Sequence, residues 1–301
     1  MSQDLPLAGL ELGGTKTICI LGTGPDDVRE QVQIPTRTPA ETFAEIHEVF
    51  GRWQAGPGFA AIGVSSFGPL DLDRRFAGFG HMAGTPKPNW SGADVLGAVV
   101  GFGVPVDIDT DVNGAGLAEA TWGGFQGLSS YAYVTVGTGL GVGGVIDGRS
   151  VNGIGHSEAG HMLPPRSNPD WPGCCPYHGA CVEGLASGAA IKARTGRTPS
   201  QIPPDDPAWD EVVEVLTLLF HNLVFTTAPQ RIAVGGGVIE GQPHLLPRIR
   251  AALVKSLAGY YSGARAAENI ETYLTAPQLG ARVGPLGALA VAQRALGFAA
   301  K

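Results

Sequence analysis

The chain has 301 residues, of which 44% are hydrophobic, and its formal net charge is −7. This content is enough for one large core or for two domains, and the acidic charge argues against non-specific binding to nucleic acids or acidic membranes. No apolar run reaches the length of a membrane span. The N-terminus lacks a signal-peptide pattern, and the four cysteines are too few and too bunched for a secreted disulfide framework. We therefore expect a cytoplasmic protein.

The first part of the chain has the pattern of strands and helices in alternation. Thr38 and Glu41 form a capping box around Pro39, and Gly56 with Pro57 ends the helix that follows. A second helix, rich in small residues, is expected over residues 113–122. The predicted strands of this part cover residues 7–12, 17–21, 28–34, 59–69 and 104–109.

A pattern of strand, glycine–threonine turn and strand occurs twice in the chain. The first copy turns at Gly13 to Lys16, and the second covers residues 131–148 with its turn at Gly137 to Gly139. Each copy opens a section of strands followed by helices, so the architecture is duplicated although the letters barely repeat. The later section is expected to contain a strand at residues 231–237 and helices at 207–226, 243–259 and 285–299.

The glycine clusters suggest a nucleotide site of an unusual kind. "GTGLGVG" looks like a dinucleotide fingerprint, but that fingerprint needs a helix directly after it, and here a strand and an Asp-Gly turn follow. No Walker A sequence is present. Two hairpins with outward-pointing N–H groups, one of them carrying Lys16, would instead hold phosphates. Gly235 to Gly237 would let a nucleoside lie on bare backbone. Each cluster alone is compatible with a tight turn, but three in this order favour nucleotide binding.

Six motifs together resemble those of the ROK sugar kinases, and more narrowly the bacterial ROK fructokinases. They are "LELGGTK", "TDVNGA", "VTVGTGLGVGG", "EAGH", "CPYHGACVEG" and "VGGGVI", and the resemblance covers nearly the whole chain. It implies the two-domain actin-like ATPase (ribonuclease H-like) α/β fold with an interdomain cleft. The implied domains are residues 1–112 and 113–283, with a C-terminal helix at 284–301 packing back on the first domain.

The same resemblance implies the substrates and the partners. ATP with Mg²⁺ would be the phosphoryl donor, a hexose, fructose above all, would be the acceptor, and the protein would form a homodimer without nucleic acid or membrane partners. The residues that match the nucleotide-binding motifs are Gly13, Gly14, Thr15, Lys16, Gly137, Thr138, Gly139, Ala189, Gly235, Gly236, Gly237, Val238 and Ile239. Ala189 is the weakest match, because related chains often carry proline there.

A candidate zinc site follows from the cysteine–histidine segment. Cys175, His178 and Cys181 have the spacing C-x₂-H-x₂-C, and His161 lies upstream across a stretch without regular pattern. Two thiolates and two imidazoles complete a tetrahedral set with no position for water, so the zinc would be structural. Cys174 is a rival ligand, but the family motif favours Cys175. The alternative is a loop with free cysteines and surface histidines.

Asp111 is the candidate catalytic residue. It lies where a strand ends and a helix begins, and from the residues alone a general base and a helix cap are equally good interpretations. The match of "TDVNGA" to the catalytic segment of the family favours the base. By resemblance the sugar ligands would be Gly68, Thr110, Glu158, His161 and Glu183. Lys87 and Trp90, in "GTPKPNW", would line the sugar side or serve as ordinary loop residues.

Two departures from the wider family narrow the assignment. Glu11 stands where most members have aspartate, and Thr110 stands where the glucokinases have asparagine. Both resemble the fructokinase branch. A hexokinase preferring mannose or glucose remains an alternative. A repressor of this family would need an N-terminal DNA-binding unit, which the sequence does not have before the first hairpin. A protein that has lost catalysis is disfavoured by Asp111, Lys16 and the zinc set.

Overall fold

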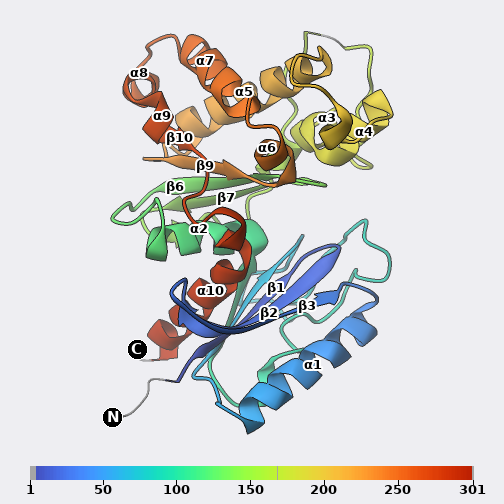
Figure 1. The fold of residues 1–301 in the computed structure, drawn as a ribbon, viewed down its shortest axis with the longest axis vertical. Coiled ribbons are helices and arrows are strands. Elements are labelled where there is room, and N and C mark those ends of the chain that lie inside the picture. Colours follow the sequence, from blue (N-terminus) through green and yellow to red (C-terminus); the bar gives the residue numbers. More distant parts are fainter. Residues whose placement is uncertain (1–4, 168, 300–301) are drawn as a thin grey trace. The chain divides into compact units, whose positions relative to one another are not determined.

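The computed structural model describes residues 5–167 and 169–299, which form two compact units (Figure 1). Unit 1 comprises Met1–Gly127, Ser150–His156 and Gln278–Lys301, and unit 2 comprises Leu128–Arg149 and Ser157–Pro277. A short stretch of unit 1 therefore interrupts unit 2 in the sequence. No helix in the described ranges is long and apolar enough to cross a bilayer.

The sheet of unit 1 places the ends of three strands at one edge. Its strand order is β3-β2-β1-β4-β5, with β1 and β2 antiparallel and β1, β4 and β5 parallel. Leu12 pairs with Ser66, and Ser66 pairs with Thr110, so the residues that follow β1, β4 and β5 meet at this edge. The strands are β1 (Leu7–Leu12), β2 (Lys16–Gly24), β3 (Asp27–Pro35), β4 (Ile62–Ser66) and β5 (Val106–Thr110).

The two faces of β1 pack against different helices. Leu10 lies in a core cluster with Phe50 of α1 (Pro39–Ala55). On the other face, a Cβ on Gly9 would lie 2.9 Å from the side chain of Ala288 in α10 (Val283–Ala299). A Cβ on Gly63 of β4 would lie 2.1 Å from the Ala288 carbonyl oxygen, so glycine permits α10 to lie directly on the sheet.

Helix α2 (Asp111–Trp122) packs beside α10 (Figure 1). Glycine faces glycine where the two helices pack, because a Cβ on Gly287 would lie 2.6 Å from the backbone of Gly114. This packing brings α2 into unit 1, whereas the domain boundary expected from the family resemblance puts residues 113–122 at the start of the second domain. Unit 1 also contains η1 (Val100–Phe102) and η4 (Gly280–Arg282).

The sheet of unit 2 repeats the strand arrangement of unit 1. Its order, read from the opposite edge, is β8-β7-β6-β9-β10, with β6 antiparallel to β7 and parallel to β9. This is the same succession of hairpin and parallel strands, so the predicted duplication is confirmed. The strands are β6 (Tyr131–Val136), β7 (Leu140–Ile146), β8 (Arg149–Ser150), β9 (Ile232–Gly235) and β10 (Leu274–Thr275).

The core of unit 2 lies between its sheet and a long buried helix, α5 (Ala208–Thr226). Trp209, Leu216 and Phe220 of this helix are fully buried and belong to the same cluster as Val134 and Val234. The other helices are η2 (Ala159–His161), α3 (Val182–Ala186), α4 (Gly188–Thr195), η3 (Pro199–Gln201), α6 (Gly237–Gly241), α7 (Leu245–Leu257), α8 (Ser262–Glu268) and α9 (Ile270–Tyr273).

Most predicted elements are confirmed, with one correction of detail. The capping box at Thr38 and Glu41 is present, and the cap after α1 is Gly56. The prediction of a strand rather than a helix after Gly139 is also correct. The strand expected at residues 231–237 is shorter, because β9 ends at Gly235 and the short helix α6 begins at Gly237. Helices α3, α4, α8 and α9 are too short for periodicity to reveal.

Candidate functional site

The first hairpin, Gly13–Lys16, joins β1 to β2. Gly13 N donates to Lys16 O at 3.1 Å, which closes the loop, and Gly14, Thr15 and Lys16 are exposed at its tip. A Cβ on Gly13 would lie 2.7 Å from Lys16 O, so this tight closure requires glycine. The tip therefore offers backbone N–H groups and one ammonium group, as a phosphate site requires.

Two residues distant in sequence hold the first hairpin by its carbonyl groups. Thr36 Oγ1 donates to Gly13 O at 2.8 Å, and Thr36 N donates to Thr15 O at 3.0 Å. Lys87 Nζ donates to Gly14 O at 2.6 Å. Because these contacts occupy carbonyl oxygens, the N–H groups of the tip remain directed elsewhere. Lys87 therefore supports the hairpin, and Trp90, fully buried with its Nε1 on Arg37 O, anchors the same loop.

The junction of β5 and α2 carries Asp111. Thr110 is the N-cap of the helix, because its Oγ1 accepts from Asn113 N at 3.2 Å. Asp111 is the first helical residue, and its Oδ1 accepts from the adjacent Val112 N at 2.8 Å. The cap that the sequence analysis considers for Asp111 is thus supplied by Thr110. A carboxylate in the first helical turn is also favoured by the helix dipole.

Glu11 lies close to Asp111 and Lys16 on the face of β1 that packs on α10. Burial raises the pKa of Glu11 to about 7, the charge of Asp111 adds to the rise, and Lys16 opposes it. A Cβ on Gly284 of α10 would lie 2.2 Å from Glu11 Oε1, so the carboxyl group fits against a bare helix backbone. Among the described residues, no group donates a hydrogen bond to the buried Glu11 Oε2.

Gly68 follows β4 at the same sheet edge and contacts a histidine that the sequence analysis did not select. A Cβ on Gly68 would lie 3.3 Å from His156 Nε2, and this nitrogen accepts from Leu70 N at 3.0 Å. The peptide bond between Gly68 and Pro69 is cis. His156 escaped sequence reasoning because it stands in an irregular stretch, 86 residues from its partner.

The second hairpin, Gly137–Gly139, joins β6 to β7 in unit 2. Gly137 N donates to Gly139 O at 2.9 Å. The carbonyl groups of its tip accept from the first N–H groups of α4: Gly188 N donates to Gly137 O at 2.7 Å, and Ala189 N donates to Thr138 O at 3.2 Å. Ala189 therefore lies beside the hairpin, as its match to the nucleotide-binding motifs implies.

The third glycine cluster meets the second hairpin. Gly236 has φ +92, and a Cβ there would lie 2.7 Å from the backbone nitrogen of Val136. A Cβ on Gly188 would lie 3.5 Å from a methyl group of Val238. Residues 137–139, 188–189 and 235–239 thus come together in unit 2, on backbone that only glycine lets approach so closely.

The four predicted zinc ligands lie within one small cluster. The ligand atoms of His161, Cys175, His178 and Cys181 are all within 4.8 Å of one another. His161 Nδ1 is 3.7 Å from Cys175 Sγ and 3.5 Å from Cys181 Sγ. Zn–S bonds of about 2.3 Å and Zn–N bonds of about 2.0 Å in a tetrahedron imply S···N separations of roughly 3.6 Å. The geometry therefore fits a tetrahedral metal, whereas Cys174 is exposed and outside the group.

The predicted sugar ligands of unit 2 are His161, which belongs to this cluster, and Glu158 and Glu183, which lie near it in sequence. His161 Nε2 is directed away from the sulfurs and lies 3.9 Å from Glu158 Oε2. Burial raises the pKa of Glu158, the neighbouring His161 lowers it, and Glu183 raises it. Glu183 Oε2 accepts from Leu140 N at 3.0 Å, directly after the second hairpin. Glu183 thus links the segment of the cysteines to the hairpin.

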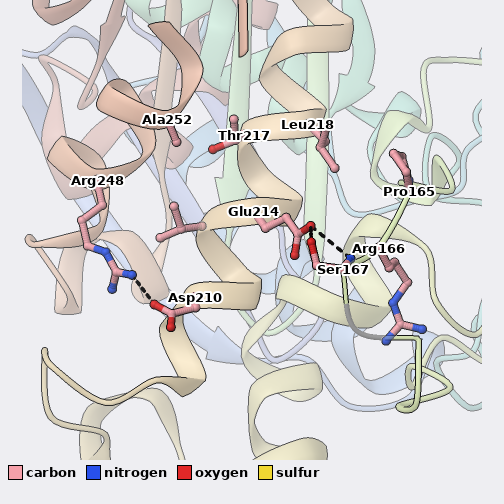
Figure 2. A pocket seen from close by; sticks show the side chains of 10 residues that line it. Pro165, Arg166, Ser167, Asp210, Glu214, Thr217, Leu218, Arg248 and Ala252 are labelled. Carbon is pink, nitrogen blue, oxygen red and sulfur yellow. Dashed lines mark hydrogen bonds and ion pairs between the residues drawn. The ribbon is translucent and has the colours of Figure 1, made fainter. Parts of the chain in front are cut away.

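A surface groove elsewhere on unit 2 contains none of the predicted residues. It lies between α5, α7 and the loop at Pro165 to Ser167 (Figure 2). Each of its charged groups already has a partner: Arg248 contacts Asp210 at 2.6 Å, Glu214 accepts from Ser167 N, and Arg166 contacts Glu211 beside the groove. We therefore assign it no part in the candidate site.

The structure groups the predicted residues into one set per unit. Unit 1 brings together the first hairpin, Gly68, Thr110 and Asp111, and unit 2 brings together the second hairpin, the third glycine cluster and the metal-ligand cluster. Sequence reasoning missed Thr36, His156 and the contacts that Asp109 makes with Ser150 and Arg294. Their polar contacts join positions tens of residues apart, which no local pattern signals.

Comparison with known proteins assigns the fold and the family. A sequence model described as "ROK family" matches residues 7–295. A fructokinase of Zymomonas mobilis is 39% identical over 97% of this chain and 98% of its own length, and a putative fructokinase of Bacillus subtilis is 35% identical over 96% of both chains.

Solved structures agree with this assignment. The ROK hexokinase of Thermus thermophilus matches with a TM-score of 0.77 at 26% identity, over 98% of this chain and 100% of its own. A ROK glucokinase of Streptomyces griseus matches with a TM-score of 0.75 at 24% identity, over 96% of this chain and 99% of its own, which supports the fold alone. The predicted two-domain actin-like ATPase fold is thereby confirmed.

Proposed function

We propose that this chain, which belongs to the ROK family, transfers the γ-phosphoryl group of ATP to the 6-hydroxyl of fructose, with Asp111 as the general base. The observation that carries the proposal is the identity of the helix cap. Thr110 caps α2, so capping does not account for the carboxylate of Asp111, which directly follows β5. The names of the full-length relatives support fructose as the acceptor.

The nucleotide would be held by both hairpins and by the third glycine cluster. Residues 137–139, Ala189 and 235–239 would bind the nucleoside and its phosphates through backbone N–H groups. Lys16 would offset phosphate charge from the first hairpin. Mg²⁺ bound to ATP would neutralise the charge that develops on the transferred phosphoryl group. Asp111 would accept the proton of the attacking hydroxyl.

The sugar would be held by Gly68, Thr110, Glu158, His161 and Glu183. Structural zinc on His161, Cys175, His178 and Cys181 would fix the His161 ring through Nδ1 and leave Nε2 to donate to a sugar hydroxyl. Glu158 beside it would accept a second hydroxyl. We also propose a homodimer, on the sequence resemblance alone.

The decisive variant is Asp111→Asn. It keeps the shape of the side chain, and the cap on Thr110 remains, but it removes the base. We expect kcat with fructose to fall by about 10²- to 10⁴-fold, the usual contribution of general-base assistance. Binding of ATP and the thermal midpoint should change little. Steady-state kinetics and calorimetric titration of ATP provide the measurements.

The acceptor is tested by following ADP release with a panel of hexoses. Fructose should give the highest kcat/KM, and glucose and mannose should give lower values. A preference for glucose or mannose would replace fructose in the proposal but leave Asp111 as the base. An Asp111→Asn enzyme with near-normal kcat on every hexose would instead exclude the catalytic role.

A further inference from the structure

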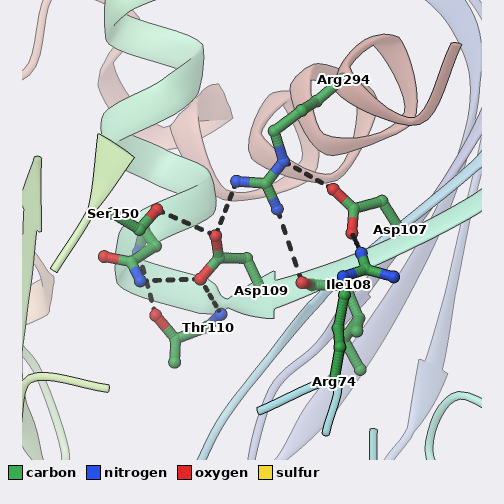
Figure 3. A network of polar contacts seen from close by, with 8 residues as sticks. Arg74, Asp107, Ile108, Asp109, Thr110, Ser150 and Arg294 are labelled. Atoms are coloured by element: carbon green, nitrogen blue, oxygen red, sulfur yellow. Dashed lines mark hydrogen bonds and ion pairs between the residues drawn. The ribbon is translucent and has the colours of Figure 1, made fainter. Parts of the chain in front are cut away.

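Two buried carboxylates lie at the end of β5, just before Asp111. Asp107 and Asp109 are each only 2% exposed, and both lie against Arg294 of α10 (Figure 3). Arg294 Nε is 2.6 Å from Asp107 Oδ2, and its Nη1 is 2.8 Å from Asp109 Oδ2. Residues two apart on a strand face the same side, so both carboxylates are directed to the helix.

Asp109 is the more highly connected of the two. Its Oδ2 accepts from Arg294 and from Ser150 Oγ at 3.1 Å. Its Oδ1 accepts from Thr110 N at 2.9 Å and from Asn113 Nδ2 at 2.7 Å. A polar group so deeply buried is stable only when hydrogen-bond partners of this kind satisfy it. Asp107, by contrast, contacts Arg294 of α10 and the exposed Arg74, and neither of these residues belongs to α2.

The two donors on Asp109 Oδ1 enclose the turn that carries Asp111. Thr110 is the cap of α2, and Asn113 is the third residue of the helix, so their bonds to one oxygen fix the residues on both sides of Asp111. The Asn113 amide is buried and has its oxygen–nitrogen orientation defined by this acceptor. The first turn of α2 therefore cannot rotate without breaking a charged hydrogen bond.

Ser150 adds a link to a segment that is distant along the chain. It is the last residue of β8, where the chain leaves unit 2, and the first residue of the stretch Ser150–His156, which belongs to unit 1. Its hydroxyl is 41 residues from Asp109 in sequence. Asp109 thus joins four separate pieces of unit 1: β5, α2, α10 and this segment.

We propose that Asp109 is a positioning residue for Asp111: anchored by Arg294 and Ser150, it holds the first helical turn through Thr110 and Asn113. The inference rests on the proposed function, because it needs Asp111 as the base. Asp109 itself touches no reacting atom. A base displaced by about 1 Å loses on the order of 10²-fold in rate, whereas substrate binding need not change.

A double-mutant cycle on Asp109→Asn and Asn113→Ala tests the proposal. Asn113→Ala removes the amide that donates to Asp109, and alanine is favourable within a helix. Asp109→Asn keeps only one acceptor oxygen, so it cannot accept from Arg294 and Ser150 on one side and from Thr110 and Asn113 on the other. Each variant should lower kcat by about 10- to 100-fold, with KM for ATP within about twofold of the wild type. Because both substitutions act through one link, the fall in kcat of the double variant should be no larger than that of the more impaired single variant. Additive losses, or losses in KM alone, would overturn the proposal.

Arg74→Ala is the matched control. Arg74 belongs to the same ion cluster but contacts Asp107 rather than Asp109, so its removal should leave kcat within about twofold even if the thermal midpoint falls. An equal loss of kcat in Arg74→Ala would reduce the cluster to a purely structural role and refute positioning.

Ser150 supplies a second pair of variants in case Asp109→Asn does not fold. Ser150→Ala removes the hydroxyl and should lower kcat several-fold, and Ser150→Thr keeps the hydroxyl and should restore it. Equal activities in the two variants would contradict the anchor. Asp111→Asn separates the two hypotheses: if it is inactive while all Asp109, Asn113 and Ser150 variants are active, only the positioning role fails. If Asp111→Asn is active, the proposed base itself fails.

Discussion

The two hairpins have the same topology, but they differ in the contacts that fix them and in the residues at their tips. The first hairpin exposes Lys16 and is held by side chains, those of Thr36 and Lys87. The second hairpin has no charged residue at its tip and is held by the N–H groups that begin α4 and by Glu183. The residue two positions before each first glycine also differs: it is Glu11 in the first hairpin and Thr135 in the second.

This difference predicts that the two hairpins contribute in different ways to the proposed nucleotide site. The first hairpin, with an ammonium group and a buried carboxyl group, would act through charge. The second, of glycine and threonine, would act through the shape and the N–H groups of its backbone.

Loss of the proposed zinc should loosen the second hairpin and leave the first intact. Cys181 caps α3, which carries Glu183, and Glu183 holds Leu140 after the second hairpin. Cys175→Ser should lose zinc and destabilise unit 2 by on the order of 5 kcal/mol, part of the 10–16 kcal/mol typical of structural zinc. Elemental analysis and hydrogen exchange of the two hairpins give the readout.

Cys174→Ser is the control for the metal. Its sulfur lies outside the cluster, so the variant should keep one zinc per chain and normal exchange rates. If Cys174→Ser loses the metal and Cys175→Ser keeps it, the ligand set is wrong. Equal deprotection of both hairpins in Cys175→Ser would show that the metal supports more than unit 2.

The charge on the first hairpin should matter more than the side chain of the second. Lys16→Met should lower kcat/KM for ATP by about 10²- to 10³-fold, the loss typical of one preorganised donor to a developing anion. Thr138→Ala, the matched change at the exposed tip of the second hairpin, should cost less than about threefold, because its backbone N–H remains. Steady-state kinetics with varied ATP compare them, and equal losses would contradict a division into charge and backbone.

The stability of the protein should depend on pH through Glu11. Its pKa rises from 4.5 to about 7 on folding, mainly by burial. Well below pH 4.5 both the folded and the unfolded state hold the proton, so Glu11 causes no pH dependence of the free energy of unfolding there. As the pH rises to 7 only the unfolded state releases it, and the free energy of unfolding falls by up to about 3 kcal/mol. At pH 4 the free energies of unfolding of Glu11→Gln and wild type should therefore differ only by the effect of replacing a neutral carboxyl group with an amide. By pH 8 this difference should have shifted by about 3 kcal/mol in favour of the variant.

Urea unfolding of both proteins across this pH range measures the difference. Glu48→Gln, on the exposed side of α1, is the control and should track the wild type at every pH. A constant difference between Glu11→Gln and wild type would mean that Glu11 ionises alike in both states. The second hairpin has Thr135 at the matching position, so the hydrogen-exchange protection factors of its amides should not change across this pH range.

Local patterns in the sequence were sufficient for many elements. The capping box at Thr38, the turn at Gly13 and the strand after Gly139 each depend on a few adjacent residues. The ligand spacing at Cys175 is local in the same sense, and the structure gathers all four predicted ligand side chains. Such features are readable because a cap, a tight turn or a short chelating loop is determined by neighbours along the chain.

Contacts between distant segments were decided by the tertiary structure. Arg294 is 185 residues from Asp109, and Lys87 is 73 residues from Gly14. An arginine in a helix of apolar and small residues, or a lysine in a proline-rich loop, has the same local pattern whether or not it meets a buried partner. The meeting depends on how glycines such as Gly63 and Gly287 let α10 approach the sheet and α2. Close approach of backbones is a property of the packed fold, so only the folded chain could show which carboxylate holds Asp111 in place.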